Sequence, residues 1–425
     1  MIYKANDPLL QSWINVPVGS DFPVQNIPFG IIAFGDSVVP ATRVGDTVVD
    51  LSVLADFGFF DELGLDDLSL FYEPVLNSFA ALGKQARVAV RERLSGLFSM
   101  SCGDLQHNAE ARELALKPVS VIENRMPVAI GDYTDFYSSI EHATNVGMMF
   151  RDPANALFPN WRHLPVGYHG RSSSIVISGA NIHRPKGQTR PDDSHPPQFG
   201  PSKQVDFELE VGFITSGSTR LGESIPVAEA EEHIFGLVLF NDLSARDLQR
   251  WEYVPLGPFL SKSFGSVISP WIVTLEALEP FRVDGPVQEP EVFPYLKTTG
   301  PRNFDIQLEV YIQPENSSPS AVCRSNFKYM YWNMAQQLAH QTINGCNINP
   351  GDLYASGTIS GPTPDSYGSM LELAWKGTKP LSLAEGSLRS FIHDNDCMII
   401  KGFADNGMVR IGFGDNLTTI LPATP

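Results

Sequence analysis

Short apolar runs bounded by turn residues constrain the fold of this chain more than any other sequence feature. Between residues 29 and 51, β-branched runs are separated by Gly35-Asp36 and Gly45-Asp46, a pattern typical of tight hairpins. They predict a small β-barrel near the N-terminus. Further strand-like runs follow: SSIVISG, VDFELEVGFIT, HIFGLVLFND, WIVTLEAL, FDIQLEVYIQ and CMIIKGFADNGMVRIGFG, the last with a hairpin signal at Asp405-Asn406-Gly407.

Two segments have helical periodicity instead. LGKQARVAVRERLSGLF carries apolar residues at helical spacing and is expected to end at Gly96, and NFKYMYWNMAQQLAHQTINGC is expected to form a helix that stops at Gly345. Glycine and proline, at 35 and 33 residues, are more frequent than average, which favours turn-rich β structure. We therefore expect a mainly β chain of the α+β class. A small N-terminal module over residues 1–127 would precede a larger β domain with few helices over residues 128–425.

Composition excludes several classes of protein. The 425 residues carry 30 Lys plus Arg against 48 Asp plus Glu, a net charge of −18, which argues against a nucleic-acid partner. GxxxxGK[ST], GxGxxG, GxSxG and HExxH are absent, so no nucleotide cofactor is expected. Apolar runs fall short of the roughly 18 residues that span a membrane. The four cysteines are scattered without a CxxC pair, and we expect them to be reduced in a cytoplasmic protein.

The strongest local signal for a functional site is Phe207-Glu208-Leu209-Glu210, inside an apolar strand. Residues two apart in a strand point to the same face, so Glu208 and Glu210 project together. An exposed polar face is the ordinary explanation of such a pair. Here the flanking residues are strongly apolar, which favours burial of both carboxylates around a cation.

Two further acids are candidate ligands for that cation. Asp242 ends the apolar run HIFGLVLFND, although an Asp at this place often caps the following helix. Asp135, in GDYTDFYSS, has aromatic neighbours and is expected in a loop, where an Asp usually stabilises a turn.

A histidine and a third acid suggest general-base chemistry. His142 follows Asp135 by seven residues and could deprotonate water if a carboxylate orients its other ring nitrogen. Glu372, in the apolar run GSMLELAWKG, is a candidate for that carboxylate. This run is expected to form a strand, and the alternative is that Glu372 pairs with Lys376 on the same face of that strand.

Cationic, amide and phenolic side chains complete the candidate site. Arginine offers a bidentate fork to a carboxylate and lysine a point charge to a developing oxyanion, so an acidic small-molecule substrate is expected. Each of these residues could also be an ordinary surface or packing residue. They are Tyr137, Arg151, Tyr168, Arg246, Gln249, Tyr253 and Lys262.

Several blocks, in order, resemble the fumarylacetoacetase family, which catalyses the last step of tyrosine and phenylalanine degradation. They are GDYTDFYSSIEHATNVGMMFR, NWRHLPVGYHGRSSSIV, DFELEVGFI, NDLSARDLQRWEYVPLGPFLSKSFG and SGTISGPTPDSYGSMLELAWKGTK. The resemblance implies a small N-terminal SH3-like barrel and a larger mixed β-roll domain. It also implies a homodimer.

The resemblance assigns roles to individual residues. It implies that Asp135, Glu208, Glu210 and Asp242 bind a divalent cation, usually calcium and alternatively magnesium. His142 would be the base, although Ile140-Glu141 stands before it where the family usually has Arg-Gln, and Glu372 would orient it. Lys262 and Gln249 would stabilise the departing group. A second, magnesium-type site would involve Lys262 and Ser266, where a Thr is more usual.

The implied substrate is 4-fumarylacetoacetate, a diketo acid cleaved to fumarate and acetoacetate by hydrolysis of a carbon–carbon bond. Two alternatives stay open: an enzyme of the same superfamily that decarboxylates, hydrates or isomerises a small oxoacid, and a non-enzymatic protein that uses calcium for stability. The implied substrate contacts are Tyr137, Arg151, Tyr168, Tyr253 and Thr358, with Arg246 beside them.

Overall fold

The computed structural model describes residues 3–192 and 194–425. A five-stranded antiparallel sheet forms the N-terminal part, in the order β4-β3-β2-β1-β5. The expected hairpins at residues 35–36 and 45–46 are confirmed, because β1 pairs with β2 and β2 with β3. The strands are β1 (Phe29–Phe34), β2 (Ser37–Val44), β3 (Thr47–Asp50), β4 (Leu116–Pro118) and β5 (Glu123–Arg125).

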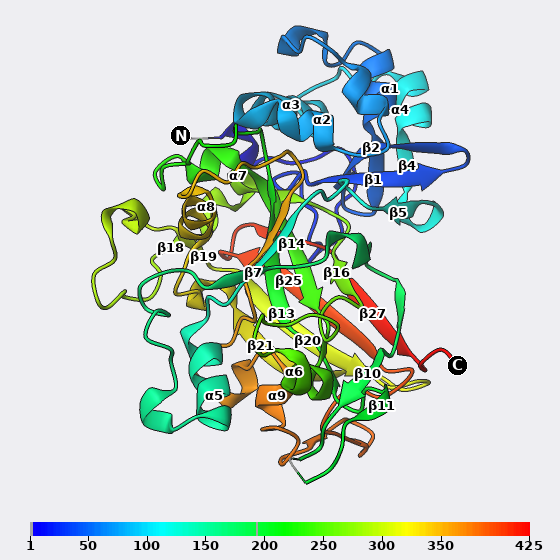
Figure 1. Ribbon diagram of the computed structural model, residues 1–425. Helices are drawn as coiled ribbons and strands as arrows, with labels where there is room; N and C mark the ends of the chain where they lie inside the picture. Colours follow the sequence, from blue (N-terminus) through cyan, green and yellow to red (C-terminus); the bar gives the residue numbers. More distant parts are fainter. Residues whose placement is uncertain (1–2, 193) are drawn as a thin grey trace.

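Helices cover this N-terminal sheet and gather at one end of the molecule (Figure 1). They are α1 (Leu51–Asp56), α2 (Asn77–Ala81), α3 (Gly83–Phe98) and α4 (Ala109–Ala115). Helix α3 continues through Gly96, where its end was predicted. Leu97 and Phe98 are fully buried in the core beneath it, so packing carries the helix past a residue of low helical propensity.

An eight-stranded mixed sheet forms the centre of the rest of the chain, in the order β7-β6-β22-β13-β14-β16-β8, with β17 beside β14. Most pairs are antiparallel, and β22 with β6 and β16 with β8 are parallel. The strands are β6 (Tyr133–Phe136), β7 (Gly167–His169), β8 (Ile175–Ile177), β13 (Leu209–Thr215), β14 (Ile234–Asp242), β16 (Ser266–Ile268), β17 (Val273–Thr274) and β22 (Leu353–Ala355).

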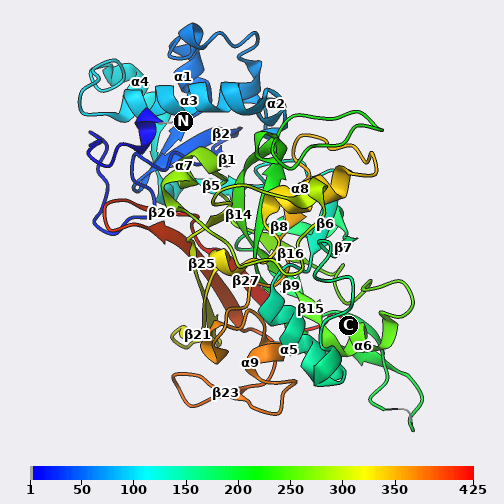
Figure 2. The ribbon, with the colours of Figure 1, turned by 90° about the vertical axis from the view of Figure 1, so that its left-hand side faces the viewer.

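A second sheet, of six strands, has the order β21-β20-β25-β27-β9, with β26 beside β25. The hairpin predicted at Asp405-Asn406-Gly407 joins β25 to β26. In Figure 2 these strands reach the N-terminal part at one end. The strands are β9 (Asn181–His183), β20 (Gln307–Gln313), β21 (Ser320–Asn326), β25 (Cys397–Asp405), β26 (Arg410–Gly412) and β27 (Asn416–Leu421).

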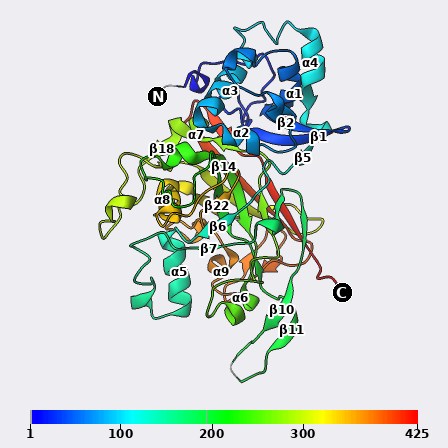
Figure 3. The same cartoon turned by 45° about the horizontal axis from the view of Figure 1, so that its top comes forward.

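Short strand pairs and helices complete the fold. The pairs are β10 (Lys186–Thr189) with β11 (Gln198–Pro201), β12 (Val205–Asp206) with β15 (Ser244–Ala245), β18 (Arg282–Val283) with β19 (Asn303–Phe304), and β23 (Leu381–Ser382) with β24 (Leu388–Arg389). The helices are α5 (Ile140–Phe150), α6 (Arg246–Glu252), α7 (Leu275–Leu278), α8 (Met334–Thr342) and α9 (Met370–Leu373). Helices α5, α6 and α9 lie away from the N-terminal part (Figure 3).

The expected mainly β chain with few helices is confirmed, but two segments differ from the prediction. WIVTLEAL is only briefly a strand, because Thr274 accepts a hydrogen bond from the Ala277 amide and starts α7. The second predicted helix begins later than expected, at Met334. Its first half is the end of β21 and a 3₁₀ turn, since the capping box of Asn333 and Gln336 sets the start of α8.

Strand β14 is buried along its whole length and separates two hydrophobic clusters. Leu237 and Leu239 pack into one cluster, while Val238 and Phe240 pack into the other, as the two-residue period of a strand requires. The second cluster also contains residues of α3, such as Val90 and Leu94. The N-terminal part therefore shares a core with the central sheet, and the domain boundary at residue 127 stays a prediction.

None of the helices within the described ranges is long and apolar enough to cross a membrane.

Candidate active site

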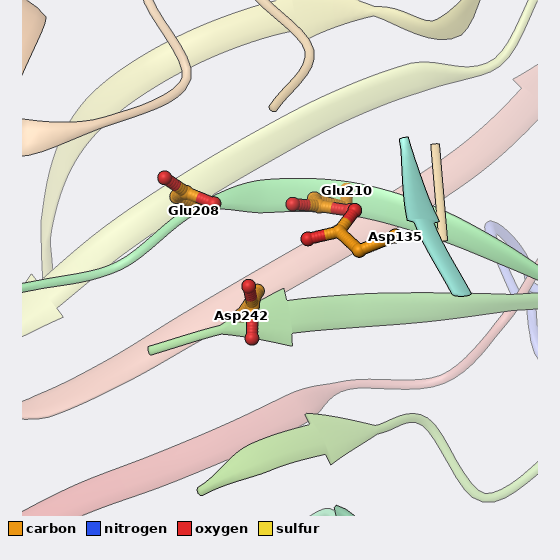
Figure 4. A group of neighbouring side chains, drawn as sticks. All are labelled: Asp135, Glu208, Glu210 and Asp242. Atoms are coloured by element: carbon orange, nitrogen blue, oxygen red, sulfur yellow. The ribbon is translucent and has the colours of Figure 1, made fainter. Parts of the chain in front are cut away.

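Four carboxylates converge where the central sheet meets the segment before β13 (Figure 4). Asp135 lies in β6, Glu210 in β13 and Asp242 at the end of β14, while Glu208 lies just before β13. One oxygen from each can be chosen so that all lie within 4.8 Å of one another. Asp135 therefore belongs to a strand, against the prediction of a loop.

The predicted common face of Glu208 and Glu210 is confirmed, because the apolar residues between and beside them point the other way. Phe207, Leu209 and Val211 all pack into the larger hydrophobic cluster. The two glutamates point to the opposite side, and their exposed fractions are 6% and 0%. Their burial excludes the alternative of an exposed polar face.

The electrostatics of the cluster are unbalanced. Burial, followed by the charge of Asp242, raises the pKa of Asp135 well above its ordinary value, and burial followed by Asp135 does the same for Glu210. Among the described residues, no hydrogen-bond donor reaches one buried oxygen of Asp135 and one of Glu210. Buried acceptors without partners are costly. An all-oxygen set with free acceptors fits a hard divalent cation such as calcium or magnesium.

The other two carboxylates are well supplied with donors. Lys262 Nζ donates to Glu208 and, at 2.6 Å, to Asp242. Ser266 Oγ donates to Asp242 over 2.7 Å, and the Tyr168 hydroxyl also donates to Asp242, over 3.2 Å. Asp242 therefore does not cap α6, whose N-cap is Ala245. The side chains of the predicted second metal site, Lys262 and Ser266, are both engaged with Asp242, and that site stays a prediction.

Burial disfavours the charged form of Glu208, but Lys262 and Arg246 outweigh it and lower the pKa of this carboxyl. Burial likewise opposes the charge of Lys262, but Asp242 and Glu208 raise its pKa. Lys262 is thus held as a cation beside two of the four carboxylates.

His142 and Glu372 form a buried pair beside the cluster. His142 lies in the first turn of α5, where Ser139 caps the helix, and its Nδ1 is 2.6 Å from Glu372 Oε2. Glu372 lies in α9 and not in the strand that its apolar neighbours suggested. It does not pair with Lys376, whose Nζ donates to the Met149 carbonyl. Because Nδ1 faces Glu372, Nε2 is the ring nitrogen left for the cavity.

Sequence reasoning missed three side chains that hold Glu372. Asn145 Nδ2, Ser360 Oγ and Ser369 Oγ each donate to it over 2.9 Å. Burial opposes the charge of Glu372, but His142, Asn145 and Ser360 together lower its pKa. Ser369 precedes Glu372 by three residues, and that Ser-x-x-Glu spacing is the signature of a helix start. Ser360 has no comparable local signal.

A cavity of about 570 Å³ opens beside the carboxylates and the histidine. Glu210, Asp242, Ser266 and Glu372 are not among the residues that line it. Its lining includes eleven of the side chains that sequence reasoning selected: Asp135, Tyr137, His142, Arg151, Tyr168, Glu208, Arg246, Gln249, Tyr253, Lys262 and Thr358.

The cavity wall offers both fixed and exposed polar groups. Arg151 donates to the Ala156 carbonyl, and its guanidinium lies 4.0 Å from the centre of the Phe158 ring. The Tyr137 ring meets the His142 ring edge to face at 5.2 Å. Tyr253, 52% exposed, stands at the mouth, whereas Thr358 is buried. The arginines and hydroxyl groups of this lining suit an acidic small molecule.

Comparisons with known proteins agree along nearly the whole chain. Residues 25–127 match the family model "Fumarylacetoacetase N-terminal", and residues 133–408 match "Fumarylacetoacetate (FAA) hydrolase C-terminal". The chain is 51% identical to the fumarylacetoacetase of Homo sapiens, over 97% of this chain and 99% of that protein. It is 52% identical to that of Dictyostelium discoideum, over 98% and 99%.

A solved structure resembles the fold. It is a fumarylacetoacetate hydrolase from psychrophilic Exiguobacterium antarcticum, with a TM-score of 0.52 and 15% identity, covering 93% of this chain and 99% of that one. At this identity the likeness supports the fold alone.

Proposed function

Because this chain belongs to the fumarylacetoacetase family, we propose that it hydrolyses the carbon–carbon bond of 4-fumarylacetoacetate to give fumarate and acetoacetate. This is the last step of tyrosine and phenylalanine degradation. The observation that carries the proposal is that one cavity meets both the carboxylate cluster and the His142–Glu372 pair. Relatives named fumarylacetoacetase support the choice of substrate.

Asp135, Glu208, Glu210 and Asp242 would hold the divalent cation, calcium or magnesium, since oxygen ligands suit both ions. When bound, the cation supplies a Lewis acid that polarises the diketone and stabilises the negative charge of the departing group. A second magnesium site at Lys262 and Ser266 belongs to the same proposal, and no nucleotide cofactor is needed.

His142 acts as the general base. Its Nε2 takes a proton from water while Glu372 holds Nδ1 and so fixes the ring. The resulting hydroxide adds to the carbonyl carbon beside the scissile bond. That bond then breaks, its electron pair stays on the methylene carbon of the leaving group, and a proton completes acetoacetate.

Several polar side chains of the cavity position the substrate and stabilise charge. Lys262, held as a cation by Glu208 and Asp242, and Gln249 face the departing enolate. Arg246 keeps Gln249 in place by donating to its Oε1 over 3.2 Å. The remaining substrate contacts are Tyr137, Arg151, Tyr168, Tyr253 and Thr358. The homodimer that the family resemblance implies and the cytoplasmic location expected from the sequence are part of the same proposal.

The test is a product assay. Purified protein is incubated with fumarylacetoacetate and, separately, with a simple acylpyruvate, after removal of divalent cations and after their return. We expect loss of the diketone absorbance and release of fumarate and acetoacetate, only with the cation present. A preference for the acylpyruvate, or release of carbon dioxide, would instead assign an oxoacid reaction of the wider superfamily.

A further inference from the structure

Asp206 is a buried carboxylate that is neither a described lining residue of the cavity nor one of the four clustered carboxylates. It contacts Arg246, which pairs with Glu208, and the start of α9, which carries Glu372. It ends β12 and is 0% exposed. Its Oδ2 accepts a hydrogen bond from Arg246 Nε over 2.8 Å. Its Oδ1 and Oδ2 also accept from the backbone amides of Met370 and Leu371, over 2.6 and 3.0 Å.

The first contact leads to the carboxylate cluster. Arg246 donates from Nε to Asp206 and places Nη1 2.8 Å from Glu208 Oε1. Arg246 therefore divides its charge between a carboxylate outside the cluster and one inside it. Without Asp206, Glu208 would be the nearest carboxylate partner left to Arg246, and the guanidinium would compete with a cation for Glu208.

The second contact leads to the base. Met370 and Leu371 are the first residues of α9, whose next residue is Glu372. By accepting both amides, Asp206 fixes the start of the helix turn that carries Glu372, which lies 2.6 Å from His142 Nδ1. One carboxylate thus holds two elements that are far apart in the chain.

We propose that Asp206 is a positioning residue that sets Glu208 for the cation and Glu372 for the base. The inference rests on the proposed function, because it presumes a cation at the carboxylate cluster and a base at His142. Asp206 itself meets neither substrate nor cation. Removing it should therefore weaken cation binding and lower kcat while leaving KM nearly unchanged.

The variant is Asp206→Asn, which has one acceptor oxygen where the carboxylate has two and cannot neutralise Arg246. The matched control is Asp247→Asn. Asp247 is likewise buried, and within the described ranges it accepts three hydrogen bonds, from Ser202 Oγ and the amides of Lys203 and Leu248, and none from a side chain of the site.

The readouts are the calcium dissociation constant by calorimetry, with kcat and KM measured at saturating calcium. For Asp206→Asn we expect calcium affinity and kcat each to fall by about 10- to 100-fold, the usual cost of losing a partner of a metal ligand. For Asp247→Asn we expect calcium affinity and kcat to stay within about threefold of the wild type. Its hydrogen bonds do not reach a side chain of the site, so their loss chiefly affects stability.

A wild-type calcium dissociation constant together with a wild-type kcat for Asp206→Asn would overturn the inference. Asp206→Ser, which keeps a small acceptor but no charge, is measured in parallel. If both variants fail to fold while Asp247→Asn folds, Asp206 is a folding residue and the inference is wrong. If the wild-type protein binds no divalent cation or cleaves no diketone, the proposed function fails instead.

Discussion

Two buried groups of charges in this molecule are built in opposite ways. Arg87 of α3 and Glu276 of α7 form a bidentate pair with N–O distances of 3.0 and 2.8 Å, and neither is more than 2% exposed. In the carboxylate cluster, four acids share the charges of Lys262 and Arg246, and two of their oxygens have no donor in the described part of the chain.

The pKa values record this difference. Burial opposes the charge of Glu276, but the hydrogen bond and charge of Arg87 outweigh it and lower the pKa of Glu276. Burial and neighbouring acids both raise the pKa of Glu210. A matched pair joins two elements of the core, whereas an excess of buried acids needs a further cation. We infer that the Arg87–Glu276 pair serves stability and that the carboxylate cluster serves chemistry.

The largest expected effect follows from removing one carboxylate of the cluster. Glu210→Gln should lower kcat/KM by about 1,000-fold, because the bound cation contributes several kcal/mol to catalysis. The same change should raise the melting temperature of the chelator-treated protein, since an acid with an unpaired oxygen is replaced by a neutral amide. Steady-state kinetics and thermal unfolding with and without chelator measure both. A lower melting temperature without metal would show that the cluster is stabilising.

The base provides the next effect. His142→Ala should reduce kcat by about 100-fold or more, the usual contribution of a general base. Calcium affinity should be nearly unchanged, because His142 is not among the four residues that could hold the cation. Calorimetry and turnover at saturating substrate separate the two functions. Equal turnover of variant and wild type would remove His142 from the mechanism.

A substitution in the Arg87–Glu276 pair should lower the stability of the protein without changing its turnover. Glu276→Gln leaves Arg87 buried without a charged partner, and we expect a loss of about 3 to 5 kcal/mol in the free energy of unfolding. Turnover per folded molecule should stay the same. Denaturant unfolding measures the loss, and the double variant Arg87→Met with Glu276→Leu should recover most of it. A lost kcat in the folded single variant would contradict the division drawn above.

The smallest effect is the pH dependence of that pair. The pKa of Glu276 in the folded chain lies below its ordinary value of 4.5, so its stabilisation is complete above that value and is lost as the pH falls through the folded pKa. The stability difference between wild type and Glu276→Gln should therefore shrink below about pH 4.5. Denaturant titrations at a series of pH values test this, and a difference that grows in acid would refute it.

Local patterns accounted for much of the site. The two-residue period of a strand correctly placed Glu208 and Glu210 on one face, and the Gly-Asp pairs correctly located the hairpins of β1 to β3. The same local reasoning put Glu372 in a strand, because its neighbours are apolar. The Ser369 cap and the acceptance of two amides by Asp206 make it a helix turn instead.

The sequence by itself determined the β character of the chain, the paired glutamates and, through ordered blocks of resemblance, the residues of the candidate site. Spacing along the chain does not say which buried polar groups meet. Asp135 and Asp242, or the Asp206 carboxylate and the Met370 amide, are brought together only by strand pairing and packing. Only the tertiary structure decided that Glu276 forms an ion pair with Arg87, whereas Glu210 keeps one buried oxygen without a donor among the described residues. The physical reason is that Coulomb energy and desolvation depend on distance and burial in space and not on separation in sequence.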